Sequence, residues 1–267
     1  MIKLIATDMD GTLLNSSRKI DKEFYEVLDK LEEKNIIMAF ASGRNLEALT
    51  KLVPNSIHER IMFISNNGNN IIYKGEQIHS STISMEDIEV VNKTIEGIKD
   101  IDRVLCMSNG IVYTSSFRNW CVGRLKGYRQ TVFKKDFKSI KGRPEKYTLF
   151  TSEENQENIL NLLEPLKDKL SVVPSGKVTI DISAKGINKG TAIEMIQTKY
   201  GISKEETMVF GDYLNDLEMM DRAYYSHAME NAHPELKKKA RFIAGHHNEK
   251  GVINAILKEI DGENNEK

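Results

Sequence analysis

Two aspartates, Asp8 and Asp10, directly follow a short apolar run at the start of the chain. The run, residues 2–6, has the composition of a buried strand, and the following Gly11 and Thr12 form a turn signal. Two carboxylates are therefore expected at the carboxyl end of a strand, the edge where ligands bind in an open α/β sheet. The alternative is that both are ordinary turn residues, because aspartate and glycine favour turns.

A second acidic group, Asp212 and Asp216, follows another apolar run at residues 207–210. If the strand ends converge, up to four carboxylates share one crevice, which is unfavourable unless some are protonated or a cation lies among them. An all-oxygen site open to a phosphate suits Mg²⁺, and no His or Cys cluster at this edge indicates zinc. The late histidines are expected at the surface: His227, His233, His246 and His247.

Further polar residues stand at a strand end and at a helix start. Ser42, Gly43 and Arg44 follow the apolar run 36–41. Lys189 precedes residues with helical spacing, so we expect it at a helix N-terminus. Free backbone N–H groups and the helix dipole favour an anion at that position.

Each of these residues has a simpler interpretation. Ser42 could cap the short helix that follows it. Lys189 could be a solvated surface lysine, with Lys185 serving the site instead. Asp216 could be purely structural, and Arg44 could contact a substrate or pair with an acid.

The elements that must position these residues alternate between strands and helices. Apolar runs predict strands at 2–6, 36–41, 61–64, 207–210 and 241–244, and amphipathic spacing predicts helices at 22–34, 45–52, 189–200 and 251–260. This alternation predicts a parallel sheet. We expect an α/β, Rossmann-like doubly wound core domain formed by residues 1–79 and 184–267.

The pattern changes over residues 80–183, which we expect to form an inserted α/β domain. Ser84 and Asp87 predict a capped helix, and two alternating runs at 103–107 and 111–114 predict a hairpin. Further helices are expected at 117–125 and 153–170, and further strands at 147–150 and 178–182.

The composition is that of an ordinary globular chain of 267 residues, 40% hydrophobic and 29% charged, with a formal net charge of -1. No broad basic surface is available for nucleic acid or an anionic membrane. No apolar run approaches the roughly 20 residues of a membrane span, and no signal peptide is visible. Cys106 and Cys121 lack the CxxC spacing of a metal or redox site, so we expect simple buried or surface thiols. We expect a cytoplasmic protein with no nucleic-acid, membrane or obligate protein partner.

Four motifs resemble those of the haloacid dehalogenase (HAD) superfamily of phosphohydrolases, in that family's order. They are Asp8-Met9-Asp10-Gly11-Thr12, Ser42 in Ala41-Ser42-Gly43-Arg44, Lys189, and Gly211-Asp212 with Asn215-Asp216. The long insertion between the second and third motifs resembles the subgroup with a C2-type (IIB) α/β cap. Two late segments are similar to the Cof-type branch: residues 228–232, Ala-Met-Glu-Asn-Ala, and residues 249–252, Glu-Lys-Gly-Val. Asn69 departs from that branch, which often has a small residue there.

The resemblance implies a Mg²⁺-dependent phosphatase acting on small phosphate monoesters. Asp8 would attack phosphorus and become an aspartyl phosphate, and Asp10 would serve as acid and then as base. Asp8, Asp212 and the backbone carbonyl of Asp10 would hold Mg²⁺, and Asp216 would orient Lys189 or a metal-bound water. The groups expected to hold the phosphoryl oxygens are Met9 N–H, Ser42, Gly43 N–H, Lys189 and Asn215.

Two alternatives remain open. The first is a phosphomutase, which would return the phosphoryl group to a sugar. The second is a phosphometabolite-binding regulator that has lost turnover. In each case the partner is a small phosphorylated metabolite, and sugar phosphates, pyridoxal phosphate and flavin mononucleotide all fit the resemblance. Residues of the insertion could line the pocket or pack it, with packing favoured for the aromatic ones: Tyr113, Trp120, Arg124 and Tyr128.

Overall fold

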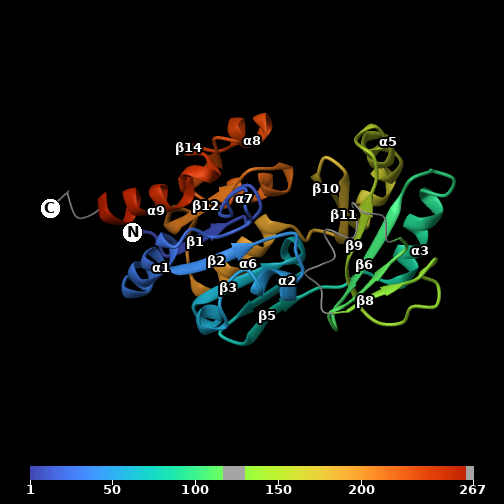
Figure 1. The fold of residues 1–267 in the computed structure, drawn as a ribbon, viewed down its shortest axis with the longest axis horizontal. Coiled ribbons are helices and arrows are strands. Elements are labelled where there is room, and N and C mark those ends of the chain that lie inside the picture. Colours follow the sequence, from blue (N-terminus) through green and yellow to red (C-terminus); the bar gives the residue numbers. More distant parts are fainter. Residues whose placement is uncertain (117–129, 263–267) are drawn as a thin grey trace.

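The computed structural model describes residues 1–116 and 130–262, which fold around two separate sheets (Figure 1). The first sheet has eight strands and the second has six. Each sheet has its own main cluster of buried apolar side chains. The predicted α/β architecture with a parallel-sheet core is confirmed.

Six neighbouring strands of the first sheet are parallel. They are β1 (Leu4–Thr7), β2 (Ile37–Ala41), β3 (Ile61–Ser65), β12 (Thr207–Gly211), β13 (Tyr225–Met229) and β14 (Phe242–Ala244). Their order is β14-β13-β12-β1-β2-β3, so that β1 lies between β2 and β12 in the middle of the sheet. Of these six, β13 was not predicted from the sequence.

Two further strands, β4 (Asn70–Tyr73) and β5 (Glu76–Ser80), extend the sheet beyond β3, pair antiparallel, and were not predicted from the sequence. The cause of the antiparallel pairing is the turn after β3, in which Asn66, Asn67 and Gly68 all have positive φ angles. This turn reverses the chain within a few residues. A parallel return needs a crossover of about a dozen residues or more, so the chain returns antiparallel.

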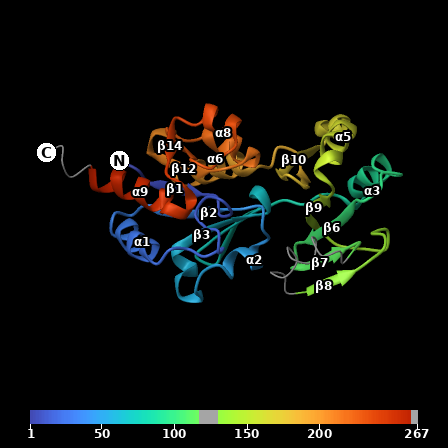
Figure 2. The ribbon, with the colours of Figure 1, turned by 45° about the horizontal axis from the view of Figure 1, so that its top comes forward.

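Helices cover both faces of the first sheet (Figure 2). One face carries α1 (Glu23–Glu33), α2 (Leu46–Thr50) and α9 (Gly251–Gly262), and the other carries α6 (Lys189–Tyr200), α7 (Leu217–Met220) and α8 (Pro234–Lys239). Right-handed crossovers that progress in opposite directions from β1 and β12 place their helices on opposite faces. Accordingly, α1 packs on α9 and α6 packs on α7.

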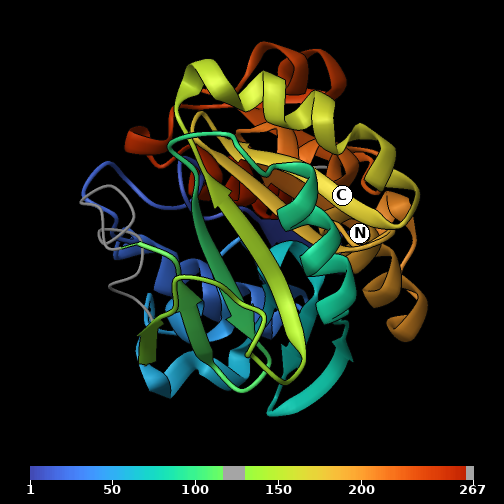
Figure 3. The same ribbon diagram turned by 90° about the vertical axis from the view of Figure 1, so that its right-hand side faces the viewer.

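The second sheet is antiparallel except for one parallel pair at its edge, formed by its second and third strands in chain order. Its strands are β6 (Asp102–Met107), β7 (Ile111–Thr114), β8 (Gln130–Phe133), β9 (Pro144–Phe150), β10 (Leu170–Gly176) and β11 (Thr179–Ala184). Helices α3 (Met85–Thr94) and α5 (Glu153–Leu163) cover its outer face, which Figure 3 shows toward the viewer. The other face is therefore free to meet the first sheet.

The predicted helix over 153–170 was too long. Helix α5 ends at Leu163, and a short 3₁₀ helix, Glu164–Asp168, follows because Pro165 cannot continue an α-helix. The next residues form β10, a strand that the sequence analysis missed. The predicted helix over 117–125 lies outside the described residues, as do Trp120, Cys121, Arg124 and Tyr128. Within the described ranges, no helix has both the length and the apolar character needed to cross a membrane.

Candidate active site

Three adjacent strands bring their polar ends together at the carboxyl edge of the first sheet. Thr7, the last residue of β1, lies opposite both Phe40 and Phe210. The backbone N–H of Asp8 donates to the Phe210 carbonyl at 2.9 Å. Asp8, Ser42 and the loop that carries Asp212 therefore lie next to one another at this edge of the sheet.

Carboxylate oxygens of Asp8, Asp212 and Asp216 all lie within 4.8 Å of one another. Burial raises the pKa of Asp8 to about 7, since Lys189 only partly offsets it and the Asp216 charge adds to it. Burial, together with the charges of Asp8 and Asp216, raises the pKa of Asp212 to about 8. A divalent cation would relieve this repulsion, and oxygen donors alone are the set that Mg²⁺ prefers. The donor chemistry of the cluster thus fits Mg²⁺.

Two glycines make room for these acids. Gly11 has φ +84°, a conformation that side chains rarely adopt, and a Cβ there would overlap the Asp212 carboxylate. A Cβ at Gly211 would lie 2.5 Å from the Cβ of Asp216. Thr12 Oγ1 also donates to Asp212 Oδ1 at 3.3 Å. The small residues in these two motifs are therefore required by the close approach of the loops.

Lys189 lies between two of the acids and is fully buried. Its Nζ is 2.5 Å from Asp8 Oδ1 and 2.7 Å from Asp216 Oδ1. Burial disfavours the ammonium form, but Asp216 and Asp8 outweigh burial and raise the pKa of Lys189. The N-cap Asn188 fixes the start of α6 by accepting from Thr191 N–H. The alternative, Lys185, is exposed and donates to the Asp168 carbonyl instead.

Asp216 also shapes the loop after β12. Its Oδ2 accepts from the backbone N–H groups of Asp212 at 3.0 Å and Tyr213 at 3.2 Å. Its other oxygen accepts from Lys189. Asp216 is therefore both a structural residue and a partner of the buried lysine.

The Asp10 side chain is not part of this cluster and pairs with Arg44. Arg44 Nε lies 2.7 Å from Asp10 Oδ2, and Nη2 lies 2.6 Å from Oδ1. Burial favours the neutral acid, but the hydrogen bond and charge of Arg44 outweigh it and lower the pKa of Asp10. Of the two possibilities for Arg44, the structure shows the pairing with an acid.

The remaining predicted phosphate-binding residues lie around the same edge. Ser42 is buried and its Oγ accepts from Arg44 N–H at 3.2 Å. It does not cap the following helix, because that position is taken by Asn45, whose side chain accepts from Ala48 N–H at 2.8 Å. Asn215 donates to Asn67 Oδ1 at 3.2 Å.

The structure adds residues from the second sheet that the sequence analysis did not name. Asp181 on β11 is buried and accepts from Thr148 Oγ1 at 2.6 Å and Asn67 Nδ2 at 2.9 Å. Lys146 on β9 donates to the Gly43 carbonyl of the first sheet. A charged residue inside an otherwise apolar strand pattern is the signal that could have revealed Asp181, whereas Lys146 follows Glu145 at the start of β9 and has no such signal.

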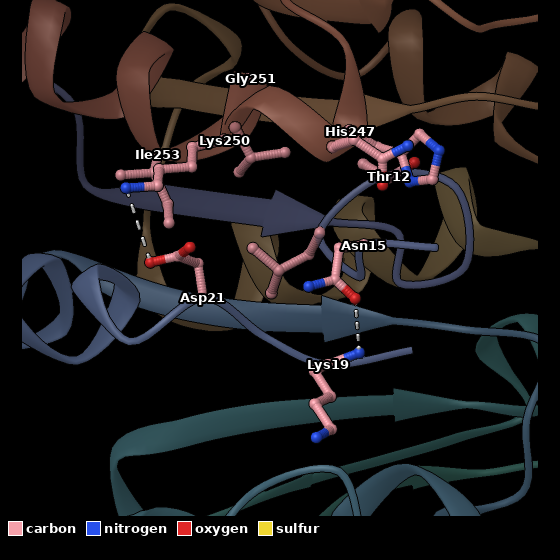
Figure 4. Close-up of a pocket in the computed structure, with 11 residues that line it drawn as sticks. Thr12, Asn15, Lys19, Asp21, His247, Lys250, Gly251 and Ile253 are labelled. Carbon is pink, nitrogen blue, oxygen red and sulfur yellow. Dashed lines mark hydrogen bonds and ion pairs between the residues drawn. The ribbon is translucent and has the colours of Figure 1, made fainter. Parts of the chain in front are cut away.

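Two loops near the C-terminal end of the chain form hydrogen bonds with the loop that follows Asp10. Asn231 Nδ2 donates to the Gly11 carbonyl at 2.8 Å, and His247 Nδ1 lies 2.8 Å from the Leu14 carbonyl. Figure 4 shows the small pocket enclosed between Thr12, His247 and Gly251. A Cβ at Gly251 would overlap the Gly245 backbone. The two late Cof-type segments thus have structural roles near the first motif.

The prediction that His227 lies at the surface was wrong. It is on β13, buried, and stacked on Phe210 and Phe242 with ring centroids 4.8 and 5.1 Å away. Burial lowers the pKa of His227 to about 4, so the ring is neutral at pH 7. Of the predicted thiols, Cys106 is buried.

Comparisons with known proteins agree with this geometry. The family model of haloacid dehalogenase-like hydrolases matches residues 5–256. The chain is 28% identical over 266 residues to 5-amino-6-(5-phospho-D-ribitylamino)uracil phosphatase YbjI of Escherichia coli (strain K12), covering 98% of this chain and 97% of YbjI. It is 30% identical to the solved structure of SMU.1108c from Streptococcus mutans UA159, with a TM-score of 0.92 and coverage of 98% and 100%.

A third comparison concerns the fold alone. The HAD subclass IIB sugar phosphatase BT4131 is 23% identical, with a TM-score of 0.82 over 97% of this chain and 99% of that one. We conclude from the family model and the curated relative that the chain belongs to the haloacid dehalogenase-like hydrolases, among the Cof-type phosphatases, and is a phosphoric monoester hydrolase.

Proposed function

We propose that this chain is a Mg²⁺-dependent phosphatase that hydrolyses small phosphate monoesters through an aspartyl phosphate on Asp8. The observation that carries the proposal is the position of the Asp8 carboxylate. It lies in a buried cluster with Asp212 and Asp216, and Lys189 Nζ is 2.5 Å away. A nucleophilic carboxylate must be kept next to positive charge if it is to approach a phosphate dianion.

Asp8, Asp212 and the backbone carbonyl of Asp10 would hold Mg²⁺. When bound, the ion supplies positive charge that neutralises the carboxylates and the substrate phosphate. Lys189 donates to Asp8 Oδ1, so that the carboxylate keeps one orientation. Asp216 keeps Lys189 charged and in place.

In the first step, a carboxylate oxygen of Asp8 forms a bond to phosphorus while the bond from phosphorus to the ester oxygen breaks. Asp10 gives its proton to the departing alcohol. In the second step, Asp10 takes a proton from water, the water oxygen bonds to phosphorus, and Asp8 is released. The pairing with Arg44 favours ionised Asp10, which is the form needed for the second step. The first step requires Asp10 to leave Arg44 and carry a proton.

The equatorial phosphoryl oxygens would be held by Met9 N–H, Ser42, Gly43 N–H, Lys189 and Asn215. These groups come from three loops at one sheet edge and from the start of α6, so they can surround a single phosphoryl group. We assign residues 1–79 and 184–267 to the core domain and residues 80–183 to an inserted C2-type cap. The substrate would be a soluble phosphorylated metabolite, and the protein would work in the cytoplasm.

The relatives support the substrate class. YbjI is named for the phosphate ester of a ribityl-substituted uracil, and BT4131 is named as a sugar phosphatase. Both names indicate a phosphate on a polyhydroxylated group. We therefore place sugar phosphates and ribityl phosphates first among the substrates to test.

The deciding experiment measures phosphate release from a panel of such esters and one chromogenic aryl phosphate. Each is assayed with Mg²⁺ and with excess chelator, for the wild type and for Asp8→Asn. We expect release that requires the metal and is lost in Asp8→Asn, because the amide is nearly isosteric but is not a nucleophile. Unchanged release by the folded variant would exclude Asp8 as the nucleophile.

A further inference from the structure

Lys146 extends from the second sheet to the loop after β2. It is 5% exposed, and its ammonium donates to the carbonyl oxygen of Gly43. Its Nζ is also 3.5 Å from Asp181 Oδ2. Lysines are rarely this buried unless they are paired. This one directs its charge at the backbone of the other sheet as well as at an acid of its own sheet.

The carbonyl that Lys146 holds belongs to the peptide between Gly43 and Arg44. The N–H of that same peptide donates to Ser42 Oγ at 3.2 Å. A cation on the carbonyl polarises the amide and strengthens the hydrogen bond made by its N–H. Lys146 therefore acts on Ser42 through a single peptide group.

The preceding peptide of the loop is held in a similar way. The backbone N–H of Asn67 donates to the Ser42 carbonyl at 2.9 Å. The Asn67 side chain donates to Asp181 at 2.9 Å and accepts from Asn215 at 3.2 Å. Both peptides that follow Ser42 are thus fixed by groups in contact with the second sheet.

We propose that Lys146 is a positioning residue that fixes the peptide between Gly43 and Arg44, and thereby aims Ser42 Oγ and the Gly43 N–H at the phosphoryl group. The inference rests on the proposed function, since it assigns these groups to phosphate. If Lys146 has this role, the phosphate-binding loop after β2 takes its binding conformation only when the second sheet is in contact with it.

The test is Lys146→Met, which keeps a long side chain and removes the charge. We expect kcat/KM to fall about 10- to 100-fold, as is typical when the support of a binding group is removed. The loss should be equal for esters with different leaving groups, because the affected contacts are to the phosphoryl group. Inhibition by inorganic phosphate, which has no leaving group, should weaken in parallel, and Lys146→Arg should recover part of the loss.

Lys185→Met is the matched control. Lys185 also donates to a backbone carbonyl, that of Asp168, but makes this contact on the exposed surface of the second sheet's own region. We expect its kinetics to be unchanged. If Lys146→Met does not fold, because Asp181 is left buried without its cation, the variant Lys146→Met with Asp181→Asn removes both charges and serves in its place.

A loss that differs between esters while phosphate inhibition stays constant would overturn the proposal and make Lys146 a contact to the leaving group. Unchanged kinetics in every variant would overturn it as well. If the wild type releases phosphate from no ester, the proposed function fails separately. Stabilisation of the wild type and of Lys146→Met by inorganic phosphate and Mg²⁺ in thermal unfolding then decides the positioning role, with equal shifts counting against it.

Discussion

The site contains two sets of carboxylates paired with a cation, and their surroundings differ. We call the buried set, Asp8, Asp216 and Lys189, the floor, and we call the pair of Asp10 and Arg44 the rim. On the floor, Asp8 and Asp216 share the fully buried ammonium of Lys189. At the rim, Asp10 pairs with Arg44, and the Asp10 side chain is 52% exposed. A buried ion pair is costly to break because one charge is left uncompensated, whereas an exposed pair contributes little to stability.

This difference matches the tasks that we assign to the two aspartates. The nucleophile must stay in one orientation, and its lysine is held by a second acid. Asp10, which we propose acts first as acid and then as base, must leave its partner during the reaction. Its ion pair with Arg44 can be broken at a low cost in free energy. In the structure, the two aspartates differ in the burial of their ion pairs.

The largest expected effect comes from removing the cation on the floor. Lys189→Met leaves Asp8 and Asp216 buried without a counter-charge, and we expect the free energy of unfolding to fall by about 3–5 kcal/mol without Mg²⁺. Phosphate release should be lost. Urea unfolding monitored by circular dichroism measures the first effect.

Mg²⁺ should stabilise this variant more than the wild type, because the uncompensated carboxylates gain more from the ion. The matched control is Lys199→Met on the same helix, since Lys199 makes an exposed ion pair with Glu76. The free energy of unfolding of Lys199→Met should differ from that of the wild type by no more than roughly 1 kcal/mol. An equal loss of unfolding free energy in Lys189→Met and Lys199→Met would show that a buried ion pair is no more important for stability than an exposed one.

The floor was largely predictable from the sequence, because its residues follow recognisable local patterns. Asp8 and Asp212 end apolar strands, and Lys189 starts a helix. The residues that reach the site from the second sheet were not predictable in the same way. The partner of Lys146 is the Gly43 carbonyl, a contact between distant segments that leaves no trace in local periodicity.

His227 was misplaced for a related reason. The strand β13 was not recognised, so nothing indicated which of its side chains point inward. Similarly, β10 was missed: its first residue, Leu170, was taken as the end of a helix, and residues 171–176 were assigned to no element. Local patterns identify strands with a continuous apolar run, and they fail for strands such as β10 and β13, which mix polar and apolar residues and whose burial depends on neighbours.

His227 provides the second prediction, since it is a buried titratable group whose Nδ1 lies 3.0 Å from the Tyr225 carbonyl oxygen. The unfolded chain takes up a proton below about pH 6.5, while the folded protein does so only near its pKa of about 4. Stability should therefore fall by roughly 3 kcal/mol as the pH drops from 6.5 to 4. The variant His227→Phe keeps an aromatic ring and should lack this component of the pH dependence. The same pH slope in both proteins would contradict the assignment.

The smallest expected effect is at the rim. Arg44→Met removes the partner of Asp10, and because the Asp10 side chain is half exposed we expect the free energy of unfolding to change by no more than about 1 kcal/mol. The pKa of Asp10 should rise toward its ordinary value, since Arg44 is what lowers it. Urea unfolding of this variant beside Lys189→Met compares rim and floor directly. A loss at Arg44 as large as that at Lys189 would mean that the rim is held as firmly as the floor, and that Asp10 is not free to change partners during catalysis.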